Sequence, residues 1–502
     1  MRTIVFFLTT ALLITSCTQQ TAHEKLDALM QDYHEQTLKM NPIGATFQGD
    51  TRYDDYLPNY LDEEVMASQK GFYTKTLKTL NSIDTGDLND QDQLSKKVLQ
   101  WECETTLMGM EFPTELLPIN QMWTLQLTMG QMAAGSSAQP FVTVTDYTNW
   151  LSRVDDYVAW LKSAKARMKE GIAQDIVLPK SLIRKVVPQL EAMTEPDLDK
   201  NIFYMPAKNF PEDFSMADKD SLAVVYADMV TTKIIPAYQE LADFMGSTYL
   251  EAGRNSSGFD AYSFGEDYYN YAIRLYTTTD MTADEIHQLG LSEVARLRSE
   301  MERIKTQVGF KGDLNAFFEH VRTLPKMMPF DNPQQVIDNF NAIHNKMKAK
   351  VDALFELQPK TPFEVRRVEA FREKSAAAHY NPGSLDGTRP GVFYVPIPNV
   401  KEYNMFSDED LFLHEAIPGH HFQISLQQED TSLPEFRKTL RYSAYGEGWA
   451  LYCESLGTEL GLYDDPYQYF GMLSAEMHRA IRLVVDTGIH TKGWTREQAI
   501  AY

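Results

Sequence analysis

The sequence predicts a mainly α-helical protein with a small β element, and three observations support this fold class. Six long segments place apolar residues three and four positions apart, the spacing of one helix face: 23–40, 61–80, 90–110, 144–172, 282–308 and 332–357. Most of these segments begin near Asp, Asn or Thr and end near Gly or Pro, as helices do. Strand signals are few, the best being FEVRRVEAF at 363–371 and GVFYVPI at 391–397, which are separated by turn-forming residues.

The first 17 residues, MRTIVFFLTTALLITSC, have the form of a secretory signal. Arg2 precedes an apolar run from Ile4 to Ile14, which is too short to span a bilayer comfortably. The run ITSC resembles a bacterial lipobox, in which Cys17 becomes the lipidated first residue; an ordinary cleaved signal is the alternative. We therefore expect an extracytoplasmic protein anchored in a membrane by lipid. Thr18 directly after the cysteine favours the outer membrane.

The charge balance excludes some classes of partner and enzyme. The 502-residue chain carries 70 acidic and 47 basic residues, a formal net charge of −23. This surplus repels phosphate backbones and no Lys/Arg-rich run offsets it, so we expect no nucleic-acid partner. Neither the phosphate-loop pattern G-x-x-x-x-G-K-[ST] nor the nucleophile elbow G-x-S-x-G occurs in the sequence.

A cluster of small and turn-forming residues at 251–265, EAGRNSSGFDAYSFG, predicts a loose boundary. We expect an N-terminal helical region at 22–260 and a second region at 261–502 that carries the chemistry. The last predicted helix, capped by Thr495, ends after about two turns, so we expect a missing segment beyond residue 502.

The stretch LFLHEAIPGHHFQ, residues 411–423, holds the most informative side chains. A serine and three acidic residues at 407–410 suit the start of a helix, which places His414 and Glu415 on that helix. In His-Glu-x-x-His zinc sites the two histidines share one helix face, and the intervening glutamate reaches the water on the metal. The pattern here is longer, because His420 and His421 are the next histidines.

An undisturbed helix would not bring His420 or His421 beside His414. Pro418 and Gly419 lie directly before them, so we expect a kink or π-bulge that returns His420 to the face of His414. His421 is the alternative ligand. A structural helix with a chance His-Glu pair is the alternative to a metal site.

A third ligand is available downstream. Glu447 follows His420 by 27 residues, which is enough for one helix, a turn and the return of a second helix. Glu454 lies seven residues further and therefore shares one helix face with Glu447. We expect a His, Glu, His, Glu constellation on an antiparallel pair of helices.

Three blocks carry a family resemblance: HEAIPGHHFQ, YGEGWALYCESLG and RLVVDTGIHTKGWTREQAI. They resemble the signature blocks of the bacterial lipoprotein family called domain of unknown function 885 (DUF885), which is grouped with metallopeptidases that use two His and one Glu as ligands. The likeness is strong from about residue 365 to 502. It implies a Zn²⁺ site of His414, His420 and Glu447, with Glu415 as general base. It also implies a large helical, metallopeptidase-like fold whose β element lies near the active-site cleft.

Several further residues are candidates for stabilising an oxyanion. His490 follows Asp486 by four residues, so the carboxylate can hold the imidazole; a structural His–Asp pair is the alternative. Tyr445 is a candidate hydroxyl donor, as are Tyr380 and Tyr442, although most tyrosines in the chain must serve in packing.

Other residues are candidates for binding a peptide. Arg482, with Arg479 on the same segment, would receive a substrate carboxylate or pair with acidic side chains. RPGVFYVPI would present an edge strand that binds a peptide backbone, with Gly391 and Phe393 at the contact.

Together these features predict zinc-dependent hydrolysis of peptide bonds in short peptides by an extracytoplasmic lipoprotein. The alternative is a peptide-binding or scaffold lipoprotein that has the helices without the chemistry. Metal content separates the two, because only the enzyme requires about one zinc ion per chain.

Overall fold

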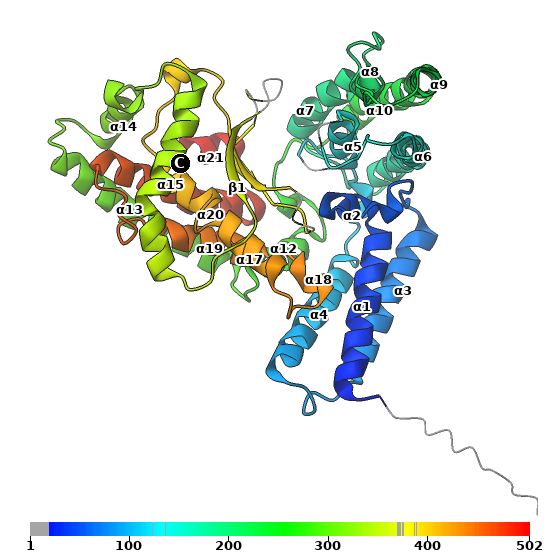
Figure 1. The fold of residues 1–502 in the computed structure, drawn as a ribbon, viewed down its shortest axis with the longest axis horizontal. Coiled ribbons are helices and arrows are strands. Elements are labelled where there is room, and N and C mark those ends of the chain that lie inside the picture. The colour runs from blue at the N-terminus through cyan, green and yellow to red at the C-terminus, as the bar shows by residue number, and fades with distance from the viewer. Residues whose placement is uncertain are drawn as a thin grey trace, which may run out of the picture.

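The computed structural model describes residues 20–502 except 123, 136, 369–372, 374–375, 386 and 388 (Figure 1). The predicted signal segment and Cys17 lie outside the described residues. The mainly helical fold class is confirmed, with one small three-stranded sheet among the described residues. No helix in this described part of the chain is both long enough and apolar enough to cross a bilayer.

The N-terminal half forms two groups of helices, drawn from blue to green on the right of Figure 1. The first group comprises α1 (Ala22–Met40), α2 (Pro42–Gln48), α3 (Glu63–Asn81) and α4 (Asp90–Gly109). The second comprises α5 (Leu125–Ala133), α6 (Val144–Ala173), α7 (Lys180–Glu191), α8 (Met205–Lys208), α9 (Met216–Met229), α10 (Ile235–Phe244) and α11 (Leu250–Ala252). Helix α6 starts in a capping box of Thr143 and Asp146, and it buries Trp150, Tyr157 and Trp160 completely.

The C-terminal half lies on the left of Figure 1. It contains α12 (Gly265–Thr277), α13 (Ala283–Gln307), α14 (Leu314–Arg322), α15 (Pro333–Leu354), α16 (Asp408–Glu415), α17 (His420–Glu429), α18 (Glu435–Lys438), α19 (Ser443–Ser455), α20 (Pro466–Thr491) and α21 (Arg496–Ala501). Helices α13 and α20 pack closely, because an added Cβ on Gly290 would lie 2.8 Å from side-chain atoms of Leu483 and Val484. Thr495 caps α21 in a capping box, as predicted.

The sheet consists of β1 (Phe363–Arg367), β2 (His379–Asn381) and β3 (Gly391–Val395). Its order is β1-β3-β2, with β1 parallel and β2 antiparallel to β3, so β3 is the central strand. The expectation that GVFYVPI forms an edge strand is therefore wrong, because both edges of β3 are already paired. Phe393 is fully buried and packs edge-on against Phe340 of α15, with ring centroids 5.1 Å apart.

The two halves meet along α4 and α18. Phe436 of α18 is buried in the same apolar cluster as Leu26 and Tyr33 of α1. The hydroxyl of Tyr442, just before α19, donates to the Glu102 carboxylate of α4 at 2.6 Å. Helix α4 therefore stands beside the elements that carry the histidine motif.

Candidate metal centre

The histidine motif is built on two helices. Helix α16 ends at Glu415, residues 416–419 form a turn, and α17 begins at His420. We expected one helix with a kink or bulge, and this is wrong, because the helix stops and a new one begins. Pro418 cannot donate the hydrogen bond that would continue α16. Gly419 is required at the turn, since an added Cβ would lie 2.0 Å from the carbonyl oxygen of His414.

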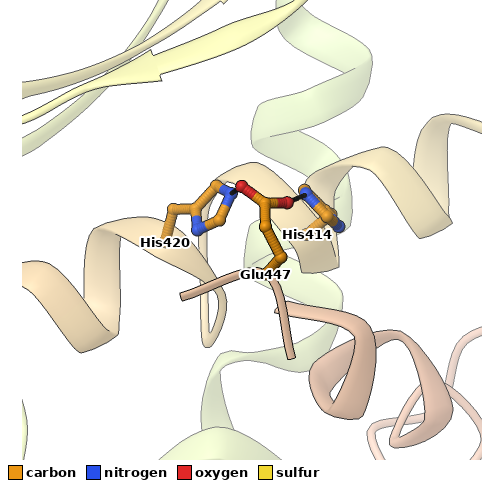
Figure 2. A group of neighbouring side chains, drawn as sticks. All are labelled: His414, His420 and Glu447. Atoms are coloured by element: carbon orange, nitrogen blue, oxygen red, sulfur yellow. Dashed lines mark ion pairs between the residues drawn. The ribbon is translucent and has the colours of Figure 1, made fainter. Parts of the chain in front are cut away.

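This turn brings the two histidine rings together in an edge-to-face arrangement. The rings of His414 and His420 have centroids 4.7 Å apart and planes at 83°. Glu447 of α19 inserts its carboxylate between them (Figure 2). Its oxygens lie 3.4 Å from His414 Nε2 and 3.8 Å from His420 Nε2. The three residues predicted as ligands thus converge from three helices.

The donor set suits a zinc ion. Two imidazole nitrogens and one carboxylate oxygen form the three-ligand set of catalytic zinc sites, which leave a further position open. The three ligating atoms lie within 4.8 Å of one another. Tetrahedral ligands bonded at about 2.0–2.1 Å are roughly 3.3 Å apart, so the set needs to contract by up to about 1.5 Å. The Glu447 side chain is 65% exposed and has room for that movement.

A buried carboxylate holds the His414 ring on the side away from Glu447. Glu454 shares one face of α19 with Glu447 and is 1% exposed. Its Oε1 lies 2.6 Å from His414 Nδ1. This contact leaves Nε2 of His414 directed at Glu447. The other oxygen of Glu454 pairs with Arg479 of α20. Such a carboxylate–histidine pair fixes the ring and its tautomer in metal sites.

The charges within the cluster favour binding a cation. Burial lowers the pKa of His414, but hydrogen bonds with Glu447 and Glu454 outweigh burial and raise it to about 10. The hydrogen bond with His414 lowers the pKa of Glu447. Burial, followed by the charge of His414, lowers the pKa of His420 to about 4. Glu447 and Glu454 therefore stabilise a positive charge on His414, and a bound metal ion would supply a positive charge at the same place.

Glu415 lies next to the ligands in a buried position. It is 9% exposed, and burial raises its pKa to about 7, while the charge of His414 acts in the opposite direction. A carboxylate whose pKa lies near neutrality can both accept and release a proton at neutral pH.

The alternative ligand, His421, faces away from the cluster. It is 1% exposed, and its Nδ1 lies 2.9 Å from the Tyr380 hydroxyl and 3.4 Å from Ser425 Oγ. Its ring packs on Phe363 of β1, with centroids 4.9 Å apart. His421 therefore joins α17 to the sheet.

The cluster lies at the wall of a large groove of about 1360 Å³. His420 and Glu447 line it together with Tyr445, which is 61% exposed. Gln91 and Val98 of α4 line it as well, so the N-terminal half contributes to the groove. A groove of this size admits an extended peptide segment.

The structure places His490 away from the cluster. Its ring stacks on Tyr269, and its Nδ1 accepts a hydrogen bond from the backbone N–H of Phe259 at 3.2 Å. Asp486 instead accepts a hydrogen bond from the Tyr269 hydroxyl at 2.6 Å. These contacts give His490 a packing role, and none of them, within the described part of the chain, reaches a candidate ligand.

The residues predicted to bind a peptide also lie in surroundings that differ from the prediction. Gly391 is buried, and its lack of a side chain makes room for Tyr380, whose hydroxyl would lie 2.2 Å from an added Cβ. Phe393 belongs to the core, as described above. Arg482 is exposed on α20, and its neighbour Arg479 is engaged by Glu454.

The sequence did not reveal which residues pack against the candidate ligands and support them. The spacing of Glu454 from Glu447 was visible, but its contact with His414 depends on how α16 and α19 pack. Asp410 is buried beside Glu454; burial, and then the charge of Glu454, raises the pKa of Asp410. Tyr463 donates to the Glu454 backbone carbonyl at 3.0 Å.

Two solved structures are similar to this chain over most of its length. The putative lipoprotein from Colwellia psychrerythraea is 25% identical, with a TM-score of 0.87, over 96% of this chain and 86% of that one. A putative lipoprotein of unknown function from Shewanella oneidensis is 18% identical, with a TM-score of 0.69 and the same coverage, and shows the same fold. No curated protein matches the chain. Residues 42–502 match the family described as bacterial protein of unknown function, DUF885, and the chain therefore belongs to that family.

Proposed function

We propose that this protein hydrolyses peptide bonds in short peptides with the help of a zinc ion. The observation that carries the proposal is the convergence of His414, His420 and Glu447 beside the buried Glu415, at the wall of a groove. A purely structural role does not require two histidines and a glutamate from three helices to direct their free nitrogens and oxygens at one point.

Each residue has a part in the proposed reaction. His414, His420 and Glu447 would hold zinc, which when bound polarises a carbonyl group and lowers the pKa of water. Glu454 holds the His414 ring in place through Nδ1. Glu415 accepts a proton from the attacking water and passes it to the departing amine, which suits its pKa of about 7. Tyr445 is exposed in the same groove and is the candidate donor to the oxyanion.

We further propose that the protein is a lipoprotein anchored through Cys17 outside the cytoplasm. The lipobox-like ITSC supports this, and the similar proteins from Colwellia psychrerythraea and Shewanella oneidensis are described as putative lipoproteins. Cys17→Ala should release a secreted protein from the membrane fraction. Unchanged membrane association of that variant would contradict the anchor.

The chemistry is tested by measuring metal and turnover in the same samples. Purified protein should contain close to one zinc per chain, and a chelator should abolish hydrolysis of short peptides. Glu415→Gln keeps the size of the side chain but cannot accept the proton, so turnover should fall by about 10²–10⁴-fold with zinc retained. Metal-free protein that hydrolyses peptides as before, or that only binds them, would reject the proposal.

A further inference from the structure

Arg441 is an unengaged cation in the groove. It lies two residues before α19 and lines the groove with Tyr380, His420 and Glu447. Its side chain is exposed, and within the described part of the chain it makes no hydrogen bond or ion pair. The guanidinium thus carries its charge into the groove without a carboxylate partner among the described residues.

Arg441 is close to the candidate metal ligands. Glu447 is the fifth residue of α19, so four helical steps and two extended ones separate the Cα atoms of Arg441 and Glu447 by at most about 13 Å. Arg441, His420 and Glu447 line the same groove, so one ligand in the groove can reach the guanidinium and the cluster together.

The other guanidinium groups near the groove are already engaged. Arg437 donates from Nη1 to Ser95 Oγ of α4 at 3.1 Å. Lys360 also lines the groove, but only its backbone N–H is bonded, to Glu429 at 2.8 Å, and its ammonium group lacks the planar fork that binds a carboxylate through two parallel bonds. Arg479 is held by Glu454 behind the ligands. Among the described groove residues, Arg441 is therefore the guanidinium available to a ligand beside the cluster.

We infer that Arg441 receives the free α-carboxylate of the peptide substrate. A guanidinium binds a carboxylate through two parallel hydrogen bonds, which gives both affinity and orientation. This inference rests on the proposed peptide hydrolysis and specifies its substrate class: peptides with an unblocked C-terminus. Because each extended residue spans about 3.3–3.6 Å, a separation of at most about 13 Å places a bond within roughly four residues of the C-terminus beside the cluster.

The test compares tetraalanine with tetraalanine amide, which differ only in the C-terminal charge. Binding is measured by calorimetry on Glu415→Gln protein, so that no cleavage interferes. Tetraalanine should bind about 10–100-fold more tightly than the amide, and adding Arg441→Gln should remove this preference by weakening tetraalanine alone. Arg437→Gln, in the same groove but engaged by Ser95, is the matched control and should retain the preference.

Hydrolysis provides a second, separate readout. Tetraalanine should be cleaved faster than its amide at low substrate concentration, and Arg441→Gln should raise KM for tetraalanine with zinc content unchanged. Equal binding of both peptides, loss of the preference in Arg482→Gln in place of Arg441→Gln, or equal weakening of both peptides by Arg441→Gln would overturn the inference. An Arg441-dependent preference without any hydrolysis would support the carboxylate site and reject the proposed peptidase function.

Discussion

Two buried charged clusters, one in each half of the molecule, differ in where their hydrogen bonds end. Arg153 of α6 is fully buried, and it donates to two backbone carbonyls and to three side chains, those of Thr46, Gln139 and Asp54. All of these partners lie inside the N-terminal half. We call Arg153 and these partners the closed cluster, because the hydrogen bonds of Arg153 stay within this half. They hold α6 to the segment around residues 46–56.

The C-terminal cluster begins at an equally buried position but is open at the other end. Glu454 binds Arg479 and orients His414, and His414 then directs Nε2 at the exposed Glu447. The comparison teaches that burial of charge alone does not mark a functional site. A site is indicated where buried groups position a polar atom that faces a groove.

The largest expected effect concerns the closed cluster. Arg153→Met leaves the buried Asp54 without its cation, so the free energy of unfolding should fall by about 3–5 kcal/mol in denaturant titrations. Zinc per folded chain should stay unchanged. Arg52→Met, which breaks exposed ion pairs with Asp50 and Glu35, is the control and should cost at most about 1 kcal/mol. Loss of zinc in folded Arg153→Met would show that the two clusters are coupled.

Substituting the two adjacent histidines, His420 and His421, should distinguish the proposed ligand from the packing residue. His420→Ala removes a proposed ligand, so zinc affinity should fall by more than about 100-fold, the upper end of the loss when a residue that supports a ligand is removed. His421→Ala should keep zinc and lower the free energy of unfolding by about 1–3 kcal/mol, because the Tyr380 hydroxyl loses its buried partner. Competitive zinc titration and thermal unfolding measure the two quantities, and the reverse pattern would make His421 the ligand.

Glu454→Gln tests the buried end of the C-terminal cluster. The amide cannot hold the His414 ring as a carboxylate does, so zinc affinity should fall by about 10–100-fold while the fold persists. Glu459→Gln, an exposed residue just after α19, should leave zinc affinity unaltered. Unchanged affinity in Glu454→Gln would assign Glu454 a structural role like that of Arg153.

The smallest expected effect concerns the contact between the halves. Burial raises the pKa of Glu102, and the hydrogen bond from Tyr442 opposes this. A carboxyl group with a raised folded pKa contributes most stability below its unfolded pKa, and that contribution is lost as pH rises through the folded value. Glu102→Gln removes this titration, so its Tm relative to wild type should increase from pH 4 to pH 7. A pH-independent difference would contradict the raised pKa.

Local patterns predicted the helices, and they singled out the three residues that the structure brings together, His414, His420 and Glu447. Apolar spacing located the long helices, and the capping residue Thr495 located the start of α21. The Pro418-Gly419 pair correctly marked the place where the backbone changes direction between His414 and His420. It did not reveal that the helix stops altogether, because a bulge and a break have the same local signal.

The sequence by itself therefore determined the helical class and the charge, and it singled out His414, Glu415, His420 and Glu447 as candidate site residues, since these depend on residue type and spacing. Only the tertiary structure decided that β3 is a central strand, that His490 packs against Phe259 and Tyr269, and that Glu454 supports His414. Strand order and contacts between distant helices depend on how whole elements pack. The same packing leaves Arg441 unengaged in the groove, which no local pattern encodes.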